Sequence, residues 1–308
     1  MMQSSLLPLV IHPEVKDALD NHRAVVALES NVITHGLNYP ANVETALAVE
    51  NAVRRSGAIP ATIGICEGNI LIGMDREHIE RFATTPGIAK VSTNTLPFVL
   101  AQNGMGATTV ASSLILAELA GIRFFSSAGI GGVHRGGEDS MDISSDLIQF
   151  TRSKVTVVSA GAKNILDIGR TLEFLETHCV PVVTYQTDDF PAFYCRSSGY
   201  RSPQRLDSLQ DIARAIAINH ALPGSASVVV ATPTKPEDAI DSRDVQAAIQ
   251  NAIDEATAAG VAGSQVTKFI MKAVEKATHG RSATANAAVL VNTAELAGEL
   301  AMVYHAQY

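Results

Sequence analysis

The chain has 308 residues, of which 46% are hydrophobic and 18% are charged, and its formal net charge is −8. This balance is typical of a globular protein with a large core. It argues against a general nucleic-acid surface, because no basic run offers a track for phosphates. The three cysteines, Cys66, Cys179 and Cys195, are odd in number and show no CxxC spacing. A disulfide framework or a zinc site is therefore not expected.

The N-terminal arm, residues 1–12, contains an apolar run from Leu6 to Ile11 with no lysine or arginine before it. The run is too short to span a membrane, and it lacks the basic start of a signal peptide. We therefore expect a cytoplasmic protein with no membrane partner, whose arm packs on the body or on a neighbouring subunit.

Apolar strands alternate with helices along the whole chain. The predicted helices run over residues 13–21, 42–56, 76–83, 96–101, 108–120, 208–221, 242–259, 267–278 and 285–306. The polar residues 138–146 open a further helix, and another helix follows Lys163 and ends at about residue 178. The predicted strands run over residues 24–28, 60–65, 70–73, 123–127, from 155 onward, 180–185 and 227–231. This order predicts an α/β fold with three layers, α/β/α, around a central mixed, mostly parallel sheet. No linker or repeat divides the chain, so residues 1–308 are expected to form one domain.

Polar, glycine and lysine residues follow the predicted strands. They are Glu29-Ser30, Lys90–Ser92, the loop Gly129–Gly137 and Lys163. Ligand sites of open α/β sheets lie beyond the carboxyl ends of the strands, so we expect these segments to converge on one edge.

Lys163 follows an apolar strand and a corner of small residues. Desolvation at such a place can lower the pKa of a lysine and make it a neutral nucleophile. The alternative is a lysine that ends the sheet and extends to water. Glu29 ends another buried strand, where a raised pKa would suit a general acid, and a salt bridge to a nearby lysine is its alternative.

The loop Gly129–Gly137 is rich in glycine, but it is not a dinucleotide fingerprint, since His134 stands where G-x-G-x-x-G requires the last glycine. Its backbone N–H groups are candidates for binding a phosphate or carboxylate, and His134 and Arg135 favour an anion. A tight structural turn is the alternative interpretation.

Asp142 and Asp146 place two carboxylates four residues apart at a helix start. One interpretation is helix capping. The other is a site for Mg²⁺ or Mn²⁺, which with so few carboxylates would keep most of its waters. Ser112, Ser113 and Ser126 have no G-x-S-x-G context, which argues against a serine hydrolase.

These segments occur in a specific order along nearly the whole chain. The matching pieces are Val26–Ser30, His35-Gly36, Gly106–Val110, Gly129–Arg135, Asp142–Asp146, Ser159–Asp167, Phe190–Phe193 and Asn286. Together they resemble the pseudouridine-5′-phosphate glycosidase family, which shares its fold with the indigoidine-cluster protein A. The resemblance implies an indigoidine synthase A-like fold and a homotrimer.

The resemblance also implies an activity: reversible cleavage of the C–C glycosidic bond of pseudouridine 5′-phosphate to uracil and ribose 5-phosphate, in an enzyme of the lyase class. It implies that Lys163 forms a Schiff base with C1′ of the ring-opened ribose and that Glu29 donates the proton. It places Mn²⁺ at Asp142 and the base near Asn286. The remaining substrate-binding residues by this resemblance, together with His134 of the loop, are Lys90, Thr109, Val110, Ser144, Ser145 and Asp146.

Several residues around the reacting pair depart from the family's usual pattern. The departures are Asn31 for Thr, Met105 for Asn, Thr93–Thr95 for Arg-Arg-Asp, Ser126–Ala128 for a segment ending in Thr-Gly, and changes at Thr232–Glu237, Thr278–Ser282 and Asn292-Thr293. Losing two arginines near Lys90 predicts weaker affinity for a phosphate dianion. An indigoidine-cluster type paralogue acting on another phosphorylated or N-linked riboside is therefore the alternative enzyme. A non-catalytic sugar-phosphate binding protein is a third possibility.

Overall fold

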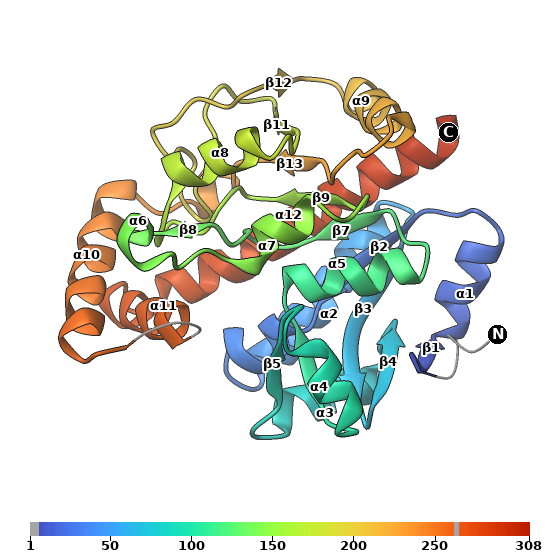
Figure 1. Ribbon diagram of the computed structural model, residues 1–308, viewed down its shortest axis with the longest axis horizontal. Helices are drawn as coiled ribbons and strands as arrows, with labels where there is room; N and C mark the ends of the chain where they lie inside the picture. Colours follow the sequence, from blue (N-terminus) through green and yellow to red (C-terminus); the bar gives the residue numbers. More distant parts are fainter. Residues whose placement is uncertain (1–5, 262–264) are drawn as a thin grey trace.

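The computed structural model describes residues 6–261 and 265–308, and its centre is an 11-stranded sheet (Figure 1). The strand order is β1-β4-β3-β2-β7-β9-β13-β11-β12, with β6 pairing β3 and β5. Neighbouring strands are parallel except that β3 is antiparallel to β4 and β6. The predicted mixed, mostly parallel sheet is confirmed.

The strands of the main sheet are β1 (Leu9–Ile11), β2 (Val25–Glu29), β3 (Ile59–Cys66), β4 (Asn69–Ile72), β5 (Ala89–Val91), β6 (Gly106–Thr108), β7 (Phe124–Ser126), β9 (Thr156–Ser159), β11 (Val182–Tyr185), β12 (Arg205–Leu206) and β13 (Val229–Ala231). A separate two-stranded sheet joins β8 (Val133–His134) to β10 (Leu166–Asp167). The central strands are buried, apolar runs, as expected where helices cover both faces of a sheet.

The helices lie on both faces of this sheet. They are α1 (Pro13–Asp20), the π-helix η2 (Val32–Gly36), α2 (Ala41–Arg55), α3 (Arg76–Thr84), α4 (Leu96–Ala101), α5 (Val110–Leu119), α6 (Gly137–Ser140), α7 (Ser145–Phe150), α8 (Ile168–Thr177), α9 (Leu209–Ala221), the 3₁₀ helix η3 (Pro236–Asp238), α10 (Ser242–Ala258), α11 (Gln265–Ala277) and α12 (Arg281–Gln307). Figure 1 shows α5 in front of the sheet and the long α12 behind it.

Helix α12 packs against α2, α9 and the strands β2, β7 and β9. Within the described part of the chain it is the one helix long and apolar enough to cross a membrane, by length and composition only, and 56% of its apolar window is buried. Its packing is that of a core helix.

The N-terminal arm packs on the body. Strand β1 pairs in parallel with β4, with Leu9 opposite Ile70, and forms the edge of the sheet. The first five residues of the predicted arm lie outside the described ranges.

The predicted helix over residues 108–120 begins too early. The structure ends strand β6 at Thr108 and starts α5 at Val110. Backbone pairing of Gly106–Thr108 with β3 and β5, together with the bond from Thr108 Oγ1 to the Ile63 carbonyl (2.8 Å), holds this segment extended. The residues before the helix are therefore part of the sheet, and α5 starts at its carboxyl edge.

Candidate active site

The carboxyl edge of the sheet brings together charged residues from four separate segments. Glu29 ends β2, Lys90 lies in β5, Asp146 lies in α7 and Lys163 lies four residues beyond β9. The charges of Lys163, Asp146 and Lys90 all act on the carboxyl of Glu29. The structure thus assembles the two predicted catalytic residues in one place.

Glu29 has one close hydrogen-bond partner, the hydroxyl of Ser127, which donates to Oε1 at 2.6 Å. Desolvation by burial raises the pKa of Glu29, and Asp146 adds to this; the charges of Lys163 and Lys90 and the Ser127 bond act in the opposite direction without cancelling it. A carboxyl with a raised pKa holds its proton to a higher pH and can act as a general acid.

Lys90 extends from β5 into the same group. Desolvation lowers the pKa of Lys90, and the positive charge of Lys163 lowers it further, while Asp146 and Glu29 act to raise it. The side chain stays accessible, so a negatively charged ligand can reach it and restore a counter-charge.

Asp146 is a buried carboxylate whose two oxygens are both bonded to backbone. Oδ1 accepts from the N–H of Ala111 in the first turn of α5 (2.9 Å), and Oδ2 accepts from the N–H of Gly131 (2.8 Å). A Cβ at Gly131 would lie 2.2 Å from the Ser144 hydroxyl, which explains the glycine. Asp146 therefore holds α5 and the glycine-rich loop together, and its charge faces Glu29 and Lys90.

The expectation that the glycine-rich loop offers free N–H groups to an anion is not met at four positions. Its bonded N–H groups are those of Ile130 (to the Gly161 carbonyl), Gly131 (to Asp146), Val133 (to Thr171 Oγ1) and His134 (to the Asp142 carbonyl). The Arg135 guanidinium donates to the carbonyl of Asn164 at 3.1 Å and to Gln246 Oε1 at 2.6 Å. These bonds describe a structural turn, because an anion there would compete with internal partners.

The corner that carries Lys163 is fixed by close packing. Gly161 has φ +73, and a Cβ there would lie 1.9 Å from the carbonyl oxygen of Pro191. The N–H of Lys163 donates to the Ile130 carbonyl (3.1 Å), and the N–H of Phe193 donates to the Ala160 carbonyl (2.7 Å). The glycine-rich loop and the segment Phe190–Phe193 therefore hold the backbone of Lys163 from two sides.

His134 and Asp142 lie near the group of Lys163 and Lys90, whose charges act on the imidazole of His134. Burial lowers the pKa of His134, the charge of Asp142 raises it, and Lys163 and Lys90 lower it. The side chains of residues 6–261 and 265–308 that are described form no group of three or more His, Cys, Asp or Glu able to hold a metal ion. Asp142 thus fits a divalent cation only as a single carboxylate ligand, with waters completing the shell.

The other predicted substrate-binding residues come from helix starts. Ser145 shares a hydrogen bond with Ser92 (2.6 Å), and Ser144 caps α7 by accepting from the Asp146 N–H (3.3 Å). The side chain of Val110 is only 1% exposed, so a ligand could reach little of Val110 except its backbone atoms. Thr109, the residue before it, is the N-cap of α5. Asn286 lies half-buried in the first turns of α12.

Some of the buried polar atoms without a hydrogen-bond partner lie on segments that follow the strands, while others, such as those of His220 and Ser225, lie elsewhere. Among the described residues, those on such segments include Asn31 Oδ1 and His35 Nε2 after β2, Thr109 Oγ1 after β6, Asn164 Oδ1 after β9 and Thr234 Oγ1 after β13. Leaving such an atom unpaired costs about 1–3 kcal/mol. Their position at the ligand edge is typical of a site that is completed by a bound molecule.

Sequence reasoning missed Ser127 and undervalued His35. Ser127 was treated only as a departure from a family pattern, although it follows β7, the neighbour of the Glu29 strand. His35 enters the sequence analysis only as part of a family match, but it lies half-buried in η2, and burial and the charges of Lys268 and Lys90 lower its pKa. Position directly after a central strand was the available signal for both.

Comparison with known proteins places this architecture in a family. The profile described as "Indigoidine synthase A like protein" matches residues 14–303. The chain belongs to this family. A pseudouridine-5′-phosphate glycosidase of Serratia proteamaculans (strain 568) is 86% identical over 305 residues, 99% of each chain. The enzyme of the same name from Escherichia coli (strain K12) is 46% identical over 96% of this chain and 95% of its own.

Two solved structures of the family share the fold. The prealnumycin C-glycosynthase AlnA in complex with ribulose 5-phosphate superposes with a TM-score of 0.90 at 44% identity, covering 97% of each chain. An indigoidine synthase A-like protein from Thermotoga maritima superposes with a TM-score of 0.87 at 31% identity, covering 96% of each chain.

Proposed function

We propose that this protein is a pseudouridine-5′-phosphate glycosidase that reversibly cleaves the C–C glycosidic bond to give uracil and ribose 5-phosphate. The observation that carries the proposal is the meeting of Glu29 and Lys163 at the sheet edge, beside Lys90. The Serratia proteamaculans relative of that name, 86% identical over 99% of each chain, supports the choice of substrate.

The chemistry needs an electron sink, because direct heterolysis would leave a carbanion at C5 of uracil. As Glu29 gives its proton to the ring oxygen, the C1′–O bond breaks and the side-chain nitrogen of Lys163 bonds to C1′. The Glu29 carboxylate then takes a proton from the nitrogen, which restores its lone pair. As Glu29 returns this proton to C5, the C1′–C5 bond breaks and the nitrogen lone pair forms the C=N bond of an iminium. One water hydrolyses the iminium, which frees Lys163 and ribose 5-phosphate.

Recognition of the sugar phosphate falls to the residues near Lys90. Its ammonium supplies the counter-charge for a dianion, and the hydroxyls of Ser144, Ser145 and Thr109 can donate to phosphate or sugar oxygens. The start of α5 adds the partial positive charge of a helix N-terminus at Val110. AlnA was solved with ribulose 5-phosphate, an acyclic pentose phosphate, which supports an open-chain sugar as a fitting ligand for this family.

Asp142 is the residue we propose to hold a divalent cation, Mn²⁺ or Mg²⁺, together with waters. Such an ion supplies positive charge and ordered water molecules near the substrate. Asp142 and His134 would orient that hydrated ion, and no bond-breaking step above depends on it. We also propose a cytoplasmic homotrimer of the lyase class, with the trimer to be tested by light scattering.

Borohydride trapping tests the proposed mechanism. Wild-type protein incubated with ribose 5-phosphate and borohydride should gain one reduced pentose phosphate on the peptide that contains Lys163, as seen by mass spectrometry. Lys163→Ala should gain none and should lose at least about 10³-fold in uracil release. Lys154→Ala is the matched control, because Lys154 is exposed and bonds to the His220 carbonyl far from this edge. An unlabelled Lys163, or full activity of Lys163→Ala, would refute the mechanism.

A second candidate function keeps the lysine chemistry and changes the aglycone. It is favoured by the name of AlnA, a C-glycosynthase, at 44% identity over 97% of the chain. Measuring uracil release from pseudouridine 5′-phosphate beside a panel of other phosphorylated and N-linked ribosides separates the two. A higher kcat/KM for another riboside would replace the first proposal by the second.

A further inference from the structure

Asn31 follows the proposed acid by two residues; it is half-buried, and its side-chain oxygen is an unpaired acceptor. Its Oδ1 is shielded from solvent and has no hydrogen-bond partner in the protein. Buried side-chain polar atoms normally have a partner, so Asn31 Oδ1 is able to accept a hydrogen bond from a ligand. An asparagine offers one acceptor and two donors, and either orientation of the amide leaves a polar group facing the same space.

The backbone around Asn31 is held firmly relative to Glu29. The N–H of Thr108 donates to the Ser30 hydroxyl (3.0 Å), and the N–H of Ser30 faces Thr108 Oγ1 (3.4 Å). Asn31 then starts the π-helix η2, and Thr34 Oγ1 donates to its carbonyl (3.4 Å). Short π-helical turns are frequent at functional sites. The Asn31 side chain is thus presented from a fixed base beside the acid.

Helix α12 also approaches the end of β2. A small cavity of about 20 Å³ beside Glu29 is lined by Val32 and Ile33 of η2 and by Leu290 of α12. Asn286 lies four residues before Leu290, on the same face of the helix. The end of β2 therefore lies close to η2, whose N-cap is Asn31, and to the part of α12 around Leu290.

We propose that Asn31 is a specificity-determining residue that hydrogen-bonds the N–H and C=O edge of the pyrimidine aglycone. This inference rests on the proposed function and deepens it. Glu29 acts at the ring oxygen, which is bonded to C1′, and C1′ carries the base. The base therefore lies beside Glu29, while the phosphate extends toward Lys90. An amide complements the alternating N–H and C=O groups of uracil, which the threonine usual in the family matches less fully.

Substitution of Asn31 tests this with two readouts. In the synthesis direction, at saturating ribose 5-phosphate, Asn31→Thr should lower kcat/KM for uracil by about tenfold. Wild-type protein should also discriminate against 1-methyluracil or 3-methyluracil, and Asn31→Thr should reduce that discrimination. Borohydride trapping of ribose 5-phosphate on Lys163 should be unchanged, because it needs no base. Asn69→Thr, in the β3–β4 hairpin, is the matched control and should leave all values unchanged.

The proposal is overturned if Asn31→Thr keeps the wild-type kcat/KM and the same discrimination against both analogues. It is also overturned if trapping of ribose 5-phosphate falls in parallel, since Asn31 would then act on the sugar step. If wild-type protein neither traps ribose 5-phosphate nor handles uracil, the proposed function fails separately. The increase in melting temperature on adding uracil then tests the role of Asn31. A smaller increase in Asn31→Thr than in wild type supports contact between Asn31 and the base, and an equal increase refutes it.

Discussion

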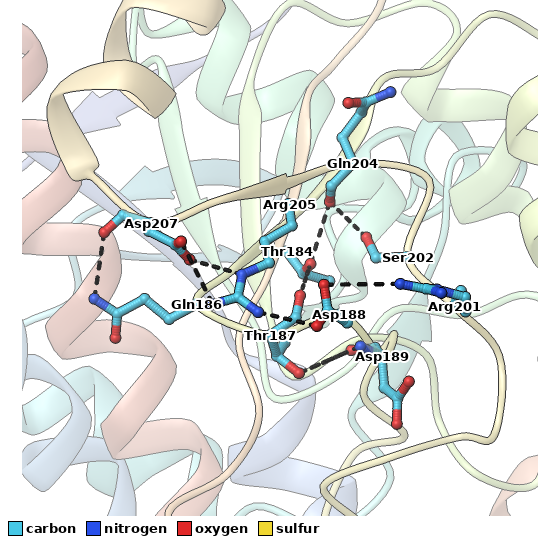
Figure 2. Close-up of polar contacts among 10 residues, drawn as sticks. All are labelled: Thr184, Gln186, Thr187, Asp188, Asp189, Arg201, Ser202, Gln204, Arg205 and Asp207. Atoms are coloured by element: carbon cyan, nitrogen blue, oxygen red, sulfur yellow. Dashed lines mark hydrogen bonds and ion pairs between the residues drawn. The ribbon is translucent and has the colours of Figure 1, made fainter.

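Two groups of charged side chains in this protein follow opposite rules. In the segment 184–207, charges pair in the open: Arg205 donates to Asp188 at 3.0 Å and to Asp207 at 2.8 Å, and Arg201 lies 4.0 Å from Asp188 (Figure 2). At the carboxyl edge of the sheet, the charged side chains of Glu29 and Lys90 lie in a partly buried site. The close hydrogen-bond partner of Glu29 there is the hydroxyl of Ser127, not a charged group.

The difference appears in the directions of the pKa shifts. The hydrogen bond that Arg205 donates to Asp207 raises the pKa of Arg205, so pairing favours its ordinary charged form. Burial instead raises the pKa of Glu29 and lowers that of Lys90, which pushes both toward neutral forms. Pairing in water keeps charges as they are, whereas burial prepares Glu29 to act as an acid and leaves the charge of Lys90 to be favoured by an anionic ligand.

The two groups are physically connected through Phe190–Phe193. The N–H of Phe190 donates to the Tyr200 carbonyl (2.9 Å), and Asp189 and Arg201 form an antiparallel bridge. The same segment packs on the corner that carries Lys163. The exposed network therefore contacts the segment that packs behind Lys163, through the Phe190–Tyr200 hydrogen bond and the Asp189–Arg201 bridge.

Glu29→Gln should have the largest effect on catalysis. Glutamine keeps the shape of the side chain but cannot supply the proton, so uracil release from pseudouridine 5′-phosphate should fall about 10²–10⁴-fold. Trapping of ribose 5-phosphate should persist, because this sugar opens its ring in water without the enzyme. Steady-state rates and trapping yields measured together check both statements, and release within about threefold of wild type would remove Glu29 from the acid role.

Gly161→Ala should have the largest effect on stability. Its φ of +73 is unfavourable for alanine, and the new Cβ would lie 1.9 Å from the Pro191 carbonyl oxygen, so we expect a loss of about 3 kcal/mol or more in the free energy of unfolding. Gly87→Ala is the matched control, since Gly87 has φ +76 with nothing within 4 Å. It should cost about 1 kcal/mol by urea denaturation, and equal losses would show that the corner is not tightly packed.

Ser127→Ala should shift the pH dependence of uracil release. The acid works only when protonated, so activity falls as the pH rises through the raised pKa of Glu29. The Ser127 bond lowers that pKa, and removing it should move the alkaline limb to higher pH. Ser202→Ala is the control, because the Ser202 hydroxyl donates to the Gln204 carbonyl (2.6 Å) in the exposed segment 184–207. If the alkaline limb of the pH–activity profile of Ser127→Ala stays in place or moves to lower pH, the Ser127 hydrogen bond does not lower the pKa of the catalytic acid.

The sequence predicted those features that depend on local patterns. Continuous apolar runs identified the central strands, and the polar residues after them located the edge where Glu29 and Lys163 meet. The use of the glycine-rich loop N–H groups was not predictable, because their partners, such as Asp146 and Thr171, are distant in sequence. For the same reason the β6 strand was missed: it is extended only because β3 and β5 lie beside it.

Asp188→Asn in the exposed network should have the smallest effect. Asp188 is more than half exposed in its side chain, and exposed ion pairs contribute about 0.2–1 kcal/mol each. We expect a loss of no more than about 1 kcal/mol in unfolding free energy, shrinking further at high salt because screening weakens what the pair contributes. The kcat/KM and the pH profile should match wild type. A catalytic loss without a matching loss of stability would mean that this network tunes the Lys163 corner directly, and the contrast between the two charged regions would no longer hold.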